Sequence, residues 1–347
     1  MAEPLLSVDH LEVSFATEEG VVHAVDEVSF DVAPGEVLAI VGESGSGKSV
    51  TAMTLMGLTR SPNARFGGSA RFGDVDLVTA SDEVLRGIRG AEIAMVFQDP
   101  ISSLNPVHRV GDQIVEQIRA HEDVTKADAL DRTVEVMERV GIPRARDRLR
   151  AYPHEFSGGM RQRVMIAMAL SCRPRLLIAD EPTTALDVTI QAQIIEEIRQ
   201  LRDETNAGVI LVTHDLGVVA DIADRVCVMY AGRVVEQGTL DEIFYDPQHP
   251  YTWGLLGSIA RIDRDRGGHL PAIPGLPPSL LDPPRGCHFR PRCPHEFDRC
   301  CERPELEARI EGVPEHRDRC WLPVGDKRER RMVDGRIGLV RDETVIA

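Results

Sequence analysis

No apolar run in the sequence approaches the roughly 18–20 residues that a membrane-spanning helix needs. Positive charge is also scarce: 40 Lys and Arg stand against 56 Asp and Glu, which gives a formal net charge of −16. Because nucleic-acid binding depends on neutralising phosphates with Lys and Arg, this balance argues against a nucleic-acid partner. The start of the chain has no basic segment ahead of an apolar core, so we expect no signal peptide. The protein is therefore expected in the cytosol, where thiols are normally reduced.

Strong compositional bias and internal repeats are absent too. Hydrophobic residues make up 42% and charged residues 28% of the 347 positions, the balance of an ordinary globular protein. This excludes a disordered chain, a collagen-like chain and a disulfide framework. The length allows one large domain with an appendage, or two domains.

Apolar and polar positions alternate in the first part of the chain. Residues 5–15 and 21–32 show this alternation around a polar turn at 16–20, which predicts an antiparallel strand pair. Residues 36–42 form a continuous apolar run that ends in glycine, and residues 49–58 have a helical pattern. A buried strand, a Gly-rich loop and a helix in this order open an α/β nucleotide-binding unit.

Helical and apolar segments alternate in the middle of the chain. Residues 78–150 have helical periodicity with charged faces and predict a mostly helical insertion. Two short apolar runs, 175–179 and 209–213, then alternate with expected helices at 158–171 and 188–205. This alternation predicts parallel strands covered by helices, an α/β fold.

The composition changes near Pro247. Pro and Gly crowd into residues 261–286, which predicts a linker. Five of the seven cysteines follow between Cys287 and Cys320. We place this cysteine region at residues 287–325 and a charged tail at 326–347.

The glycine loop, residues 42–49 (GESGSGKS), fits the pattern G-x-x-x-x-G-K-S/T at every fixed position. Glycines let backbone N–H groups point at phosphate oxygens, and the next helix presents its positive end to the same anion. In this pattern Lys48 reaches the β- and γ-phosphates, and the Ser49 hydroxyl can bind Mg²⁺. The alternative is a flexible Gly/Ser turn, but the strand before and the helix after favour nucleotide binding.

A second motif, residues 176–181 (LLIADE), is an apolar strand that ends in two carboxylates. Ligands of α/β folds bind at this edge of the sheet. Asp180 is expected in the Mg²⁺ shell, and Glu181 is expected to act on the attacking water as general base. The alternative is a solvated pair of acids.

Two further polar residues follow apolar strands. His214 ends the strand after Glu181, and Gln98 follows the apolar run at residues 93–97. Neighbouring parallel strands would bring both to the edge that carries Glu181. Each is a weak indication alone, since a single His at a strand end is more often structural.

Residues 157–162 (SGGMRQ) supply a second anion site at the start of a helix. The glycine loop already accounts for one nucleotide, so this site makes sense if it faces the nucleotide of a partner chain. Together these motifs resemble the ATP-binding cassettes of ABC transporters over about residues 5–260. Met160 departs from that family, because many members have Gln there.

The resemblance implies a P-loop NTPase cassette at residues 1–260, with a RecA-like core, an antiparallel β subdomain and a helical subdomain at about 98–170. It implies that ATP contacts Phe15, which would stack on adenine, and Gly42, Glu43, Ser44, Gly45, Ser46, Gly47, Lys48, Ser49 and Val50. It implies Mg²⁺ ligands at Ser49, Gln98 and Asp180, a signature for the partner's ATP at Ser157, Gly158, Gly159, Met160 and Gln162, and a D-loop at Asp187. The resemblance also implies that Glu181, His214 and Gln98 are the catalytic residues. Such cassettes dimerise head-to-tail around ATP.

Four cysteines, Cys287, Cys293, Cys300 and Cys320, have the spacing C-x5-C-x6-C-x19-C, and Cys301 directly follows Cys300. Their thiolates suit either Zn²⁺ or an iron–sulfur cluster, and a metal-free set also remains open. The spacing argues mildly against zinc, which usually takes paired C-x₂₋₄-C ligands. Cys172 and Cys227 lie in apolar contexts and are expected in the core.

A narrower resemblance covers residues 249–323, at HPYT (249–252), IPGLPP (273–278) and the cysteines from Gly286 onward. It is to the C-terminal extension of oligopeptide and dipeptide importer ATPases, some of which bind a 4Fe–4S cluster through four such cysteines. It implies a peripheral subunit on the cytoplasmic face of the membrane. The partners would be a second ATPase chain, paralogous or identical, two transmembrane permease subunits and an extracytoplasmic peptide-binding protein. Residues 99–106 also resemble this group and would meet the permease.

Three other functions fit less well. Import of nickel or another small solute uses closely related cassettes and stays open, because nothing in the chain contacts cargo. A DNA-repair ATPase would insert a long coiled coil between residues 49 and 157, and no sustained heptads occur there. A P-loop kinase does not account for residues 157–162.

Overall fold

The computed structural model describes residues 3–99, 103–183, 188–258, 273–333 and 336–338. Its larger sheet has eight strands in the order β11-β12-β10-β9-β3-β8-β7-β6. The strands are β3 (Val37–Val41), β6 (Ile93–Val96), β7 (Leu176–Asp180), β8 (Gly208–Thr213), β9 (Arg225–Tyr230), β10 (Arg233–Thr239), β11 (Glu307–Ala308) and β12 (Arg317–Asp318).

The five strands from β9 to β6 are parallel, and β10 turns back antiparallel to β9. Every residue of β3, β7 and β8 is buried, as expected for central parallel strands covered on both faces. The expected α/β architecture is confirmed. Because the strands are parallel, the loops after β3, β6, β7 and β8 all leave the same edge of the sheet.

A second sheet, in the order β2-β1-β4-β5, is antiparallel. It comprises β1 (Leu6–Thr17), β2 (Gly20–Val32), β4 (Ala64–Phe72) and β5 (Val75–Asp76). The β1–β2 hairpin confirms the expected strand pair. Its apolar side chains share one core with β3 and with helix α1 (Lys48–Leu55), so this sheet supports the glycine loop from one side.

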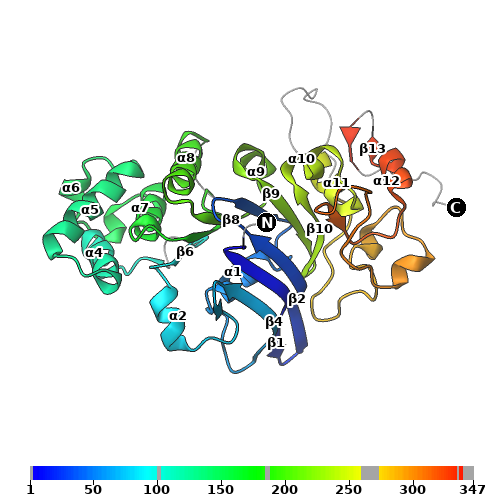
Figure 1. Cartoon of the computed structure of the whole chain (residues 1–347), viewed down its shortest axis with the longest axis horizontal. Helices are drawn as coiled ribbons and strands as arrows, with labels where there is room; N and C mark the ends of the chain where they lie inside the picture. Colours follow the sequence, from blue (N-terminus) through cyan, green and yellow to red (C-terminus); the bar gives the residue numbers. More distant parts are fainter. Residues whose placement is uncertain (1–2, 100–102, 184–187, 259–272, 334–335, 339–347) are drawn as a thin grey trace.

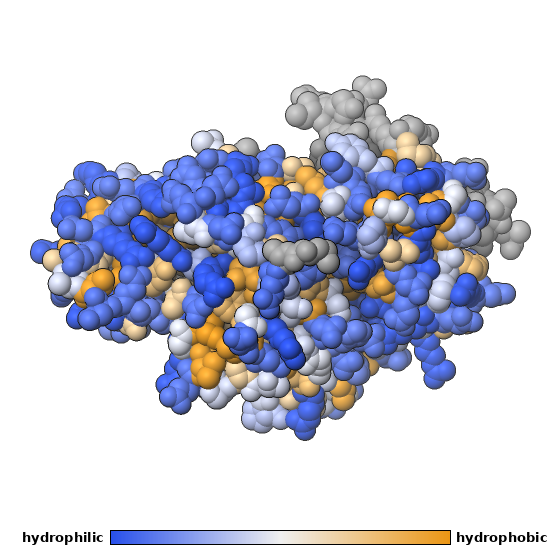
Figure 2. Space-filling view, in the orientation of Figure 1, coloured by the Kyte–Doolittle hydropathy of each residue, from blue (hydrophilic) through white to orange (hydrophobic). Residues whose placement is uncertain are grey.

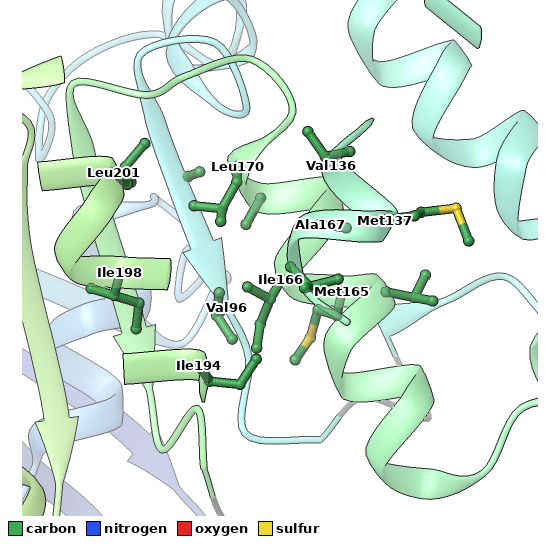
Figure 3. Packing of buried hydrophobic residues seen from close by; sticks show 14 of the residues in the cluster. Val96, Val136, Met137, Met165, Ile166, Ala167, Leu170, Ile194, Ile198 and Leu201 are labelled. Atoms are coloured by element: carbon green, nitrogen blue, oxygen red, sulfur yellow. The ribbon is translucent and has the colours of Figure 1, made fainter. Parts of the chain in front are cut away.

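The helical region contains α4 (Val110–His121), α5 (Lys126–Arg139), α6 (Ala145–Arg148) and α7 (Gly158–Leu170). Figure 3 shows Ile166 and Leu170 of α7 packed near Val96 of β6 and Ile198 of α8 (Val188–Thr205). One continuous apolar cluster thus joins the helical region to the sheet. Helices α2 (Asp82–Ile88) and α9 (Leu216–Ile222) complete the cassette. The helical region and the C-terminal part of the chain lie at opposite ends of the long axis (Figure 1).

The C-terminal part contains α10 (Leu240–Tyr245), α11 (Pro250–Gly257), two short 3-10 turns at Arg290–Arg292 and Asp298–Cys301, α12 (Val324–Arg330), β13 (Met332–Val333) and β14 (Arg336–Ile337). Strand β12 pairs with β10, so the cysteine region extends the main sheet. Residues 273–286 form neither helix nor strand, as expected, yet they pack on the cassette: the Leu280 carbonyl accepts a hydrogen bond from the His23 N–H (2.9 Å).

The expected boundary between residues 325 and 326 is wrong, because it cuts through α12. That helix docks through a fully buried Lys327, whose ammonium lies 2.7 Å from the Asp318 carboxylate. The charged composition of this segment is as expected, but the sequence alone does not indicate that Lys327 is buried.

Hydrophilic residues dominate the face of the molecule shown in Figure 2. Among the residues described, no helix combines the length and apolar character needed to cross a bilayer.

Candidate functional site

The glycine loop joins β3 to α1 at the carboxyl edge of the sheet. Gly42 and Gly47 have φ angles of 155° and 100°. A Cβ on Gly42 would lie 2.1 Å from the Met229 carbonyl oxygen, and one on Gly47 would lie 2.4 Å from the Ala24 carbonyl oxygen. Both contacts are to backbone, so neither position accepts a side chain. The tight packing against β2 and β9 therefore holds the loop in shape.

Lys48 begins α1 and folds back over the loop. Its Nζ donates to the carbonyls of Gly42 (2.8 Å) and Glu43 (2.9 Å). Burial lowers the pKa of Lys48, although the carboxylates of Glu181, Asp180 and Glu43 oppose this change. The result is a buried cation held against the backbone carbonyls of the loop.

Ser49 and Asp180 meet beside this lysine. The Ser49 hydroxyl donates to the Asp180 carboxylate at 3.1 Å. Asp180 is buried, and this burial raises its pKa; the Ser49 hydrogen bond lowers it again, and the charge of Glu181 raises it. A hydroxyl and a carboxylate at this distance form a donor pair of the kind that Mg²⁺ binds.

Glu181 sits between two other polar side chains. Its Oε2 accepts from the Gln98 amide at 2.8 Å, and its Oε1 lies 3.0 Å from Nδ1 of His214. Glu181 has a φ of 49°, and its side chain is only 13% exposed, against 63% for His214. The three residues follow the neighbouring strands β6, β7 and β8, so the expectation that they share one edge is confirmed.

The residues expected to face a partner's nucleotide lie at the start of α7. Ser157 caps this helix by accepting from the Met160 N–H at 3.4 Å, and Ser157 and Gly158 are exposed. Gln162 is different, because its side chain is buried and donates to the Pro182 carbonyl of its own chain. Gln162 thus ties α7 to the segment that follows Glu181.

Phe15 and Asp187 are two further residues expected at the ATP site. Phe15 lies on β1, opposite Val22 and Ala64 in register, with its side chain partly packed into the core of the antiparallel sheet. Asp187 falls outside the described residues, so the structure gives it no position.

The four expected cysteine ligands line one small cavity, together with apolar, histidine and arginine side chains. Burial raises the pKa of Cys287 to about 11 and that of Cys320 to about 12; it also raises the pKa of Cys293 and Cys300. Cys301 is exposed, and its thiol donates to the Asp298 carbonyl at 2.8 Å. Cys301 therefore points away from the cavity. Cys172 and Cys227 are buried, as expected.

Sequence reasoning missed several residues around the glycine loop. The Glu43 carboxylate forms a two-pronged ion pair with Arg292 of the cysteine region, and the Glu43 N–H donates to the Tyr251 hydroxyl at 2.8 Å. Nothing in the local sequence signals these contacts, because the partners lie more than 200 positions away.

Comparisons with known proteins agree with this geometry. Residues 25–184 match the ABC transporter family, and residues 235–300 match the C-terminal region of oligopeptide/dipeptide transporters. The oligopeptide transport ATP-binding protein OppD of Salmonella typhimurium is 53% identical over 93% of this chain and 95% of its own length. The dipeptide transport ATP-binding protein DppD of Bacillus subtilis is 53% identical over 92% of this chain and 95% of its own length.

Among solved structures, the dimeric bacterial ABC transporter cassette MJ0796 superposes with a TM-score of 0.62 at 25% identity, over 68% of this chain and 98% of the cassette. The chain belongs to the family of ABC transporter ATP-binding proteins and carries the C-terminal region found in its oligopeptide/dipeptide transporters.

Proposed function

We propose that this chain is the ATP-hydrolysing subunit of an importer of dipeptides and oligopeptides. The contacts of Glu181 with Gln98 and His214, beside the Ser49–Asp180 hydrogen bond, carry the proposal. They bring a base next to a phosphate-binding loop and a donor pair for Mg²⁺, which is what hydrolysis of a nucleoside triphosphate requires. The cargo class is inferred from the relatives, whose names describe oligopeptide and dipeptide transport.

ATP is proposed to lie along residues 42–50, with its β- and γ-phosphates against the glycine loop and Phe15 against the adenine. The start of α1 supports this placement, because Gly47 offers no side chain to cap the helix and leaves its N–H groups for phosphate oxygens. Lys48 would exchange its two carbonyl partners for the phosphates. Mg²⁺ fits Ser49, Asp180 and Gln98, whose hydroxyl, carboxylate and amide oxygens are its preferred ligand types; when bound, it neutralises phosphate charge.

Glu181 is proposed to take a proton from water. The water oxygen then bonds to the γ-phosphorus, while the bond from that phosphorus to the bridging oxygen of ADP breaks. Gln98 and His214 hold the two oxygens of Glu181 and fix its orientation. Since a carboxylate only accepts hydrogen bonds, His214 must donate through Nδ1.

The exposed start of α7 supports a head-to-tail dimer. Ser157 and Gly158 offer a hydroxyl and an open backbone at a helix N-terminus, which suits the phosphates of a second chain's ATP. We propose a paralogous ATPase chain as this partner. Two permease subunits and an extracytoplasmic peptide-binding protein would complete the importer, with this chain on the cytoplasmic face of the membrane.

The four thiols that line the cavity are proposed to hold a 4Fe–4S cluster rather than zinc. Four thiolates around one zinc ion at about 2.3 Å place their sulfurs about 3.8 Å apart. Among the described residues, no three cysteine sulfurs lie within 4.8 Å of one another. This arrangement does not match a closed four-cysteine zinc site, and thiols alone are the ligands of most iron–sulfur clusters. When bound, such a cluster supplies a cross-link between segments that have few regular elements.

Transport can be tested by co-expressing the chain with the permeases encoded near it and measuring ATPase activity in liposomes. Peptide together with its binding protein should stimulate hydrolysis, and nickel should not. Stimulation by nickel alone would contradict the peptide assignment and favour the small-solute alternative.

The metal is tested separately, by iron and sulfide analysis of anaerobically purified protein. Wild type should contain iron and sulfide in about equal amounts. Cys300→Ser should lose most of the iron, whereas the matched variant Cys301→Ser should keep it. One zinc and no iron would overturn the cluster.

A further inference from the structure

Glu43 occupies the second position of the glycine loop, and all its polar groups are engaged. Its carbonyl accepts from Lys48 at 2.9 Å, its N–H donates to the Tyr251 hydroxyl at 2.8 Å, and its carboxylate pairs with Arg292. The last two partners come from α11 and from the cysteine region. The segment after the cassette core therefore holds one residue of the loop at two of its three polar groups.

The ion pair between Glu43 and Arg292 is bidentate. Nη1 of Arg292 lies 2.6 Å from Oε2 of Glu43, and Nη2 lies 3.1 Å from Oε1. This two-pronged arrangement is the strong, directional form of an arginine–carboxylate pair. The Arg292 side chain is 4% exposed and the Glu43 side chain 29%, so the pair is partly shielded from solvent.

Arg292 is itself fixed from several sides. Its Nε donates to the Pro274 carbonyl at 2.9 Å, and its second amino group also donates to the Ile273 carbonyl at 3.1 Å. It further donates to the Tyr230 hydroxyl at 3.3 Å. These hydrogen bonds thus fix the guanidinium in the position in which it contacts the glycine loop.

The charge of Glu43 makes this arrangement necessary. A carboxylate in a loop that receives a triphosphate would repel the ligand, and it also attracts the Lys48 ammonium that the phosphates need. We propose that Arg292 is a positioning residue for ATP binding: it neutralises Glu43 and holds it away from the phosphates. This inference rests on the proposed ATP site and adds to it a requirement from outside the cassette core.

The proposal predicts an unusual pattern among variants of the full chain. Arg292→Ala leaves a carboxylate without its partner beside the phosphates, so the Kd for Mg-ATP should rise about tenfold. Glu43→Gln removes the charge that needs neutralising, and its Kd should stay within about threefold of wild type. The double variant Arg292→Ala/Glu43→Gln should bind within about threefold of Glu43→Gln. Removing the Glu43 charge should thus restore the ATP affinity that is lost with Arg292.

The measurement is calorimetric titration of purified chain with Mg-ATP, together with KM and kcat. KM should follow Kd while kcat changes less than about threefold, because the loss affects ground-state and transition-state binding alike. Arg290→Ala is the matched control, since Arg290 lies in the same 3-10 turn but pairs with Glu296. Its Kd should equal that of wild type.

Rescue separates this role from a purely structural one. If Arg292 served only to hold the Ile273 and Pro274 carbonyls, the double variant would bind as weakly as Arg292→Ala, and the proposal would be overturned. An equal loss in Arg290→Ala would also overturn it. Should Arg292→Ala fail to fold in thermal unfolding without nucleotide, Arg292→Met keeps the buried stem, and the same rescue is expected.

Lys48→Ala distinguishes failure of this inference from failure of the ATP site itself. It should abolish measurable ATP binding. If Lys48→Ala bound ATP normally, the proposed site would be wrong. If it lost ATP while Arg292→Ala bound like wild type, the site would stand and only the role of Arg292 would be wrong.

Discussion

The carboxyl edge of the parallel sheet and the cysteine region are built by different means. At the sheet edge, regular strands carry each functional side chain to its place, and Gln98, Glu181 and His214 meet because β6, β7 and β8 are neighbours. The cysteine region has two-residue strands and single 3-10 turns. It depends instead on buried ion pairs such as Lys327–Asp318 and on four converging thiols.

The two regions should therefore respond differently to single substitutions. Backbone hydrogen bonds of a sheet are repeated along each strand, so no single side chain decides whether the edge exists. The cysteine region has few such repeated backbone hydrogen bonds, and single polar contacts between distant segments hold it together instead. We therefore expect substitutions at the edge to affect chemistry and binding. Substitutions in the cysteine region should affect stability, except at Arg292, which contacts the glycine loop.

The largest effect is expected at the sheet edge. Glu181→Gln keeps the shape and the Gln98 and His214 neighbours but removes the base, so kcat should fall about 10²–10⁴-fold. ATP affinity should stay close to that of wild type, because the glycine loop is unchanged. The check is phosphate release under saturating ATP beside equilibrium ATP binding. Near-normal phosphate release would exclude Glu181 as the base.

A buried pair in the cysteine region gives the next effect. Lys327→Ala leaves the Asp318 carboxylate without its principal partner in a site that excludes water, and should lower the free energy of unfolding by about 3–5 kcal/mol. Denaturant unfolding measures this loss. Arg330→Ala is the control on the same helix, since its exposed pair with Asp326 is worth about 0–1 kcal/mol. Equal losses in both variants would show that Lys327 contributes no more than a surface charge.

A smaller effect is expected at the glycine loop. Gly47→Ala forces a Cβ onto the Ala24 carbonyl at a positive φ, which must displace the loop, so the Kd for ATP should rise at least about tenfold. Gly158→Ala is the matched change at the start of α7, where a Cβ meets no atom within 4 Å. The isolated Gly158→Ala chain should bind ATP like wild type in the same titration. Similar losses in both variants would mean that any added methyl group near a helix start is harmful.

The sheet edge could be predicted because its signals are local. Strand, glycine loop and helix follow one another within some twenty residues, and parallel order then places Asp180, Glu181 and His214 at one edge. The contacts that distant segments of the chain make with this edge could not be predicted. Tyr251 and Arg292 contact Glu43 across sequence separations of 208 and 249 positions, and no pattern in a single sequence encodes such contacts.

The cysteine region could be predicted in composition but not in structure. Its spacing identified four thiols, and the structure distinguishes Cys300, which lines the cavity, from the exposed Cys301. The segment expected as a charged tail includes the buried Lys327. Whether a charged residue is exposed depends on its tertiary partner, and Asp318 supplies one here.

A pH dependence gives the smallest expected effect. Nε2 of His316 lies 2.8 Å from the Glu236 carboxylate, and both side chains are buried. Burial alone would lower the pKa of His316, but the hydrogen bond and charge of Glu236 raise it above the ordinary 6.5. A raised folded-state pKa stabilises the protein fully below pH 6.5, and this stabilisation is lost as the pH rises through the raised value.

His316→Gln should remove this dependence. Unfolding free energies of wild type and variant, measured from pH 5.5 to 8.5, should differ more at the acidic end than at the basic end. His10→Gln, which changes an exposed histidine beside Asp9 on the antiparallel sheet, should run parallel to wild type. If the His316→Gln difference stayed constant with pH, the histidine would be neutral throughout and the Glu236 contact would be an ordinary hydrogen bond. The cysteine region would then owe its stability at this point to packing and neutral hydrogen bonds, without a contribution from charge.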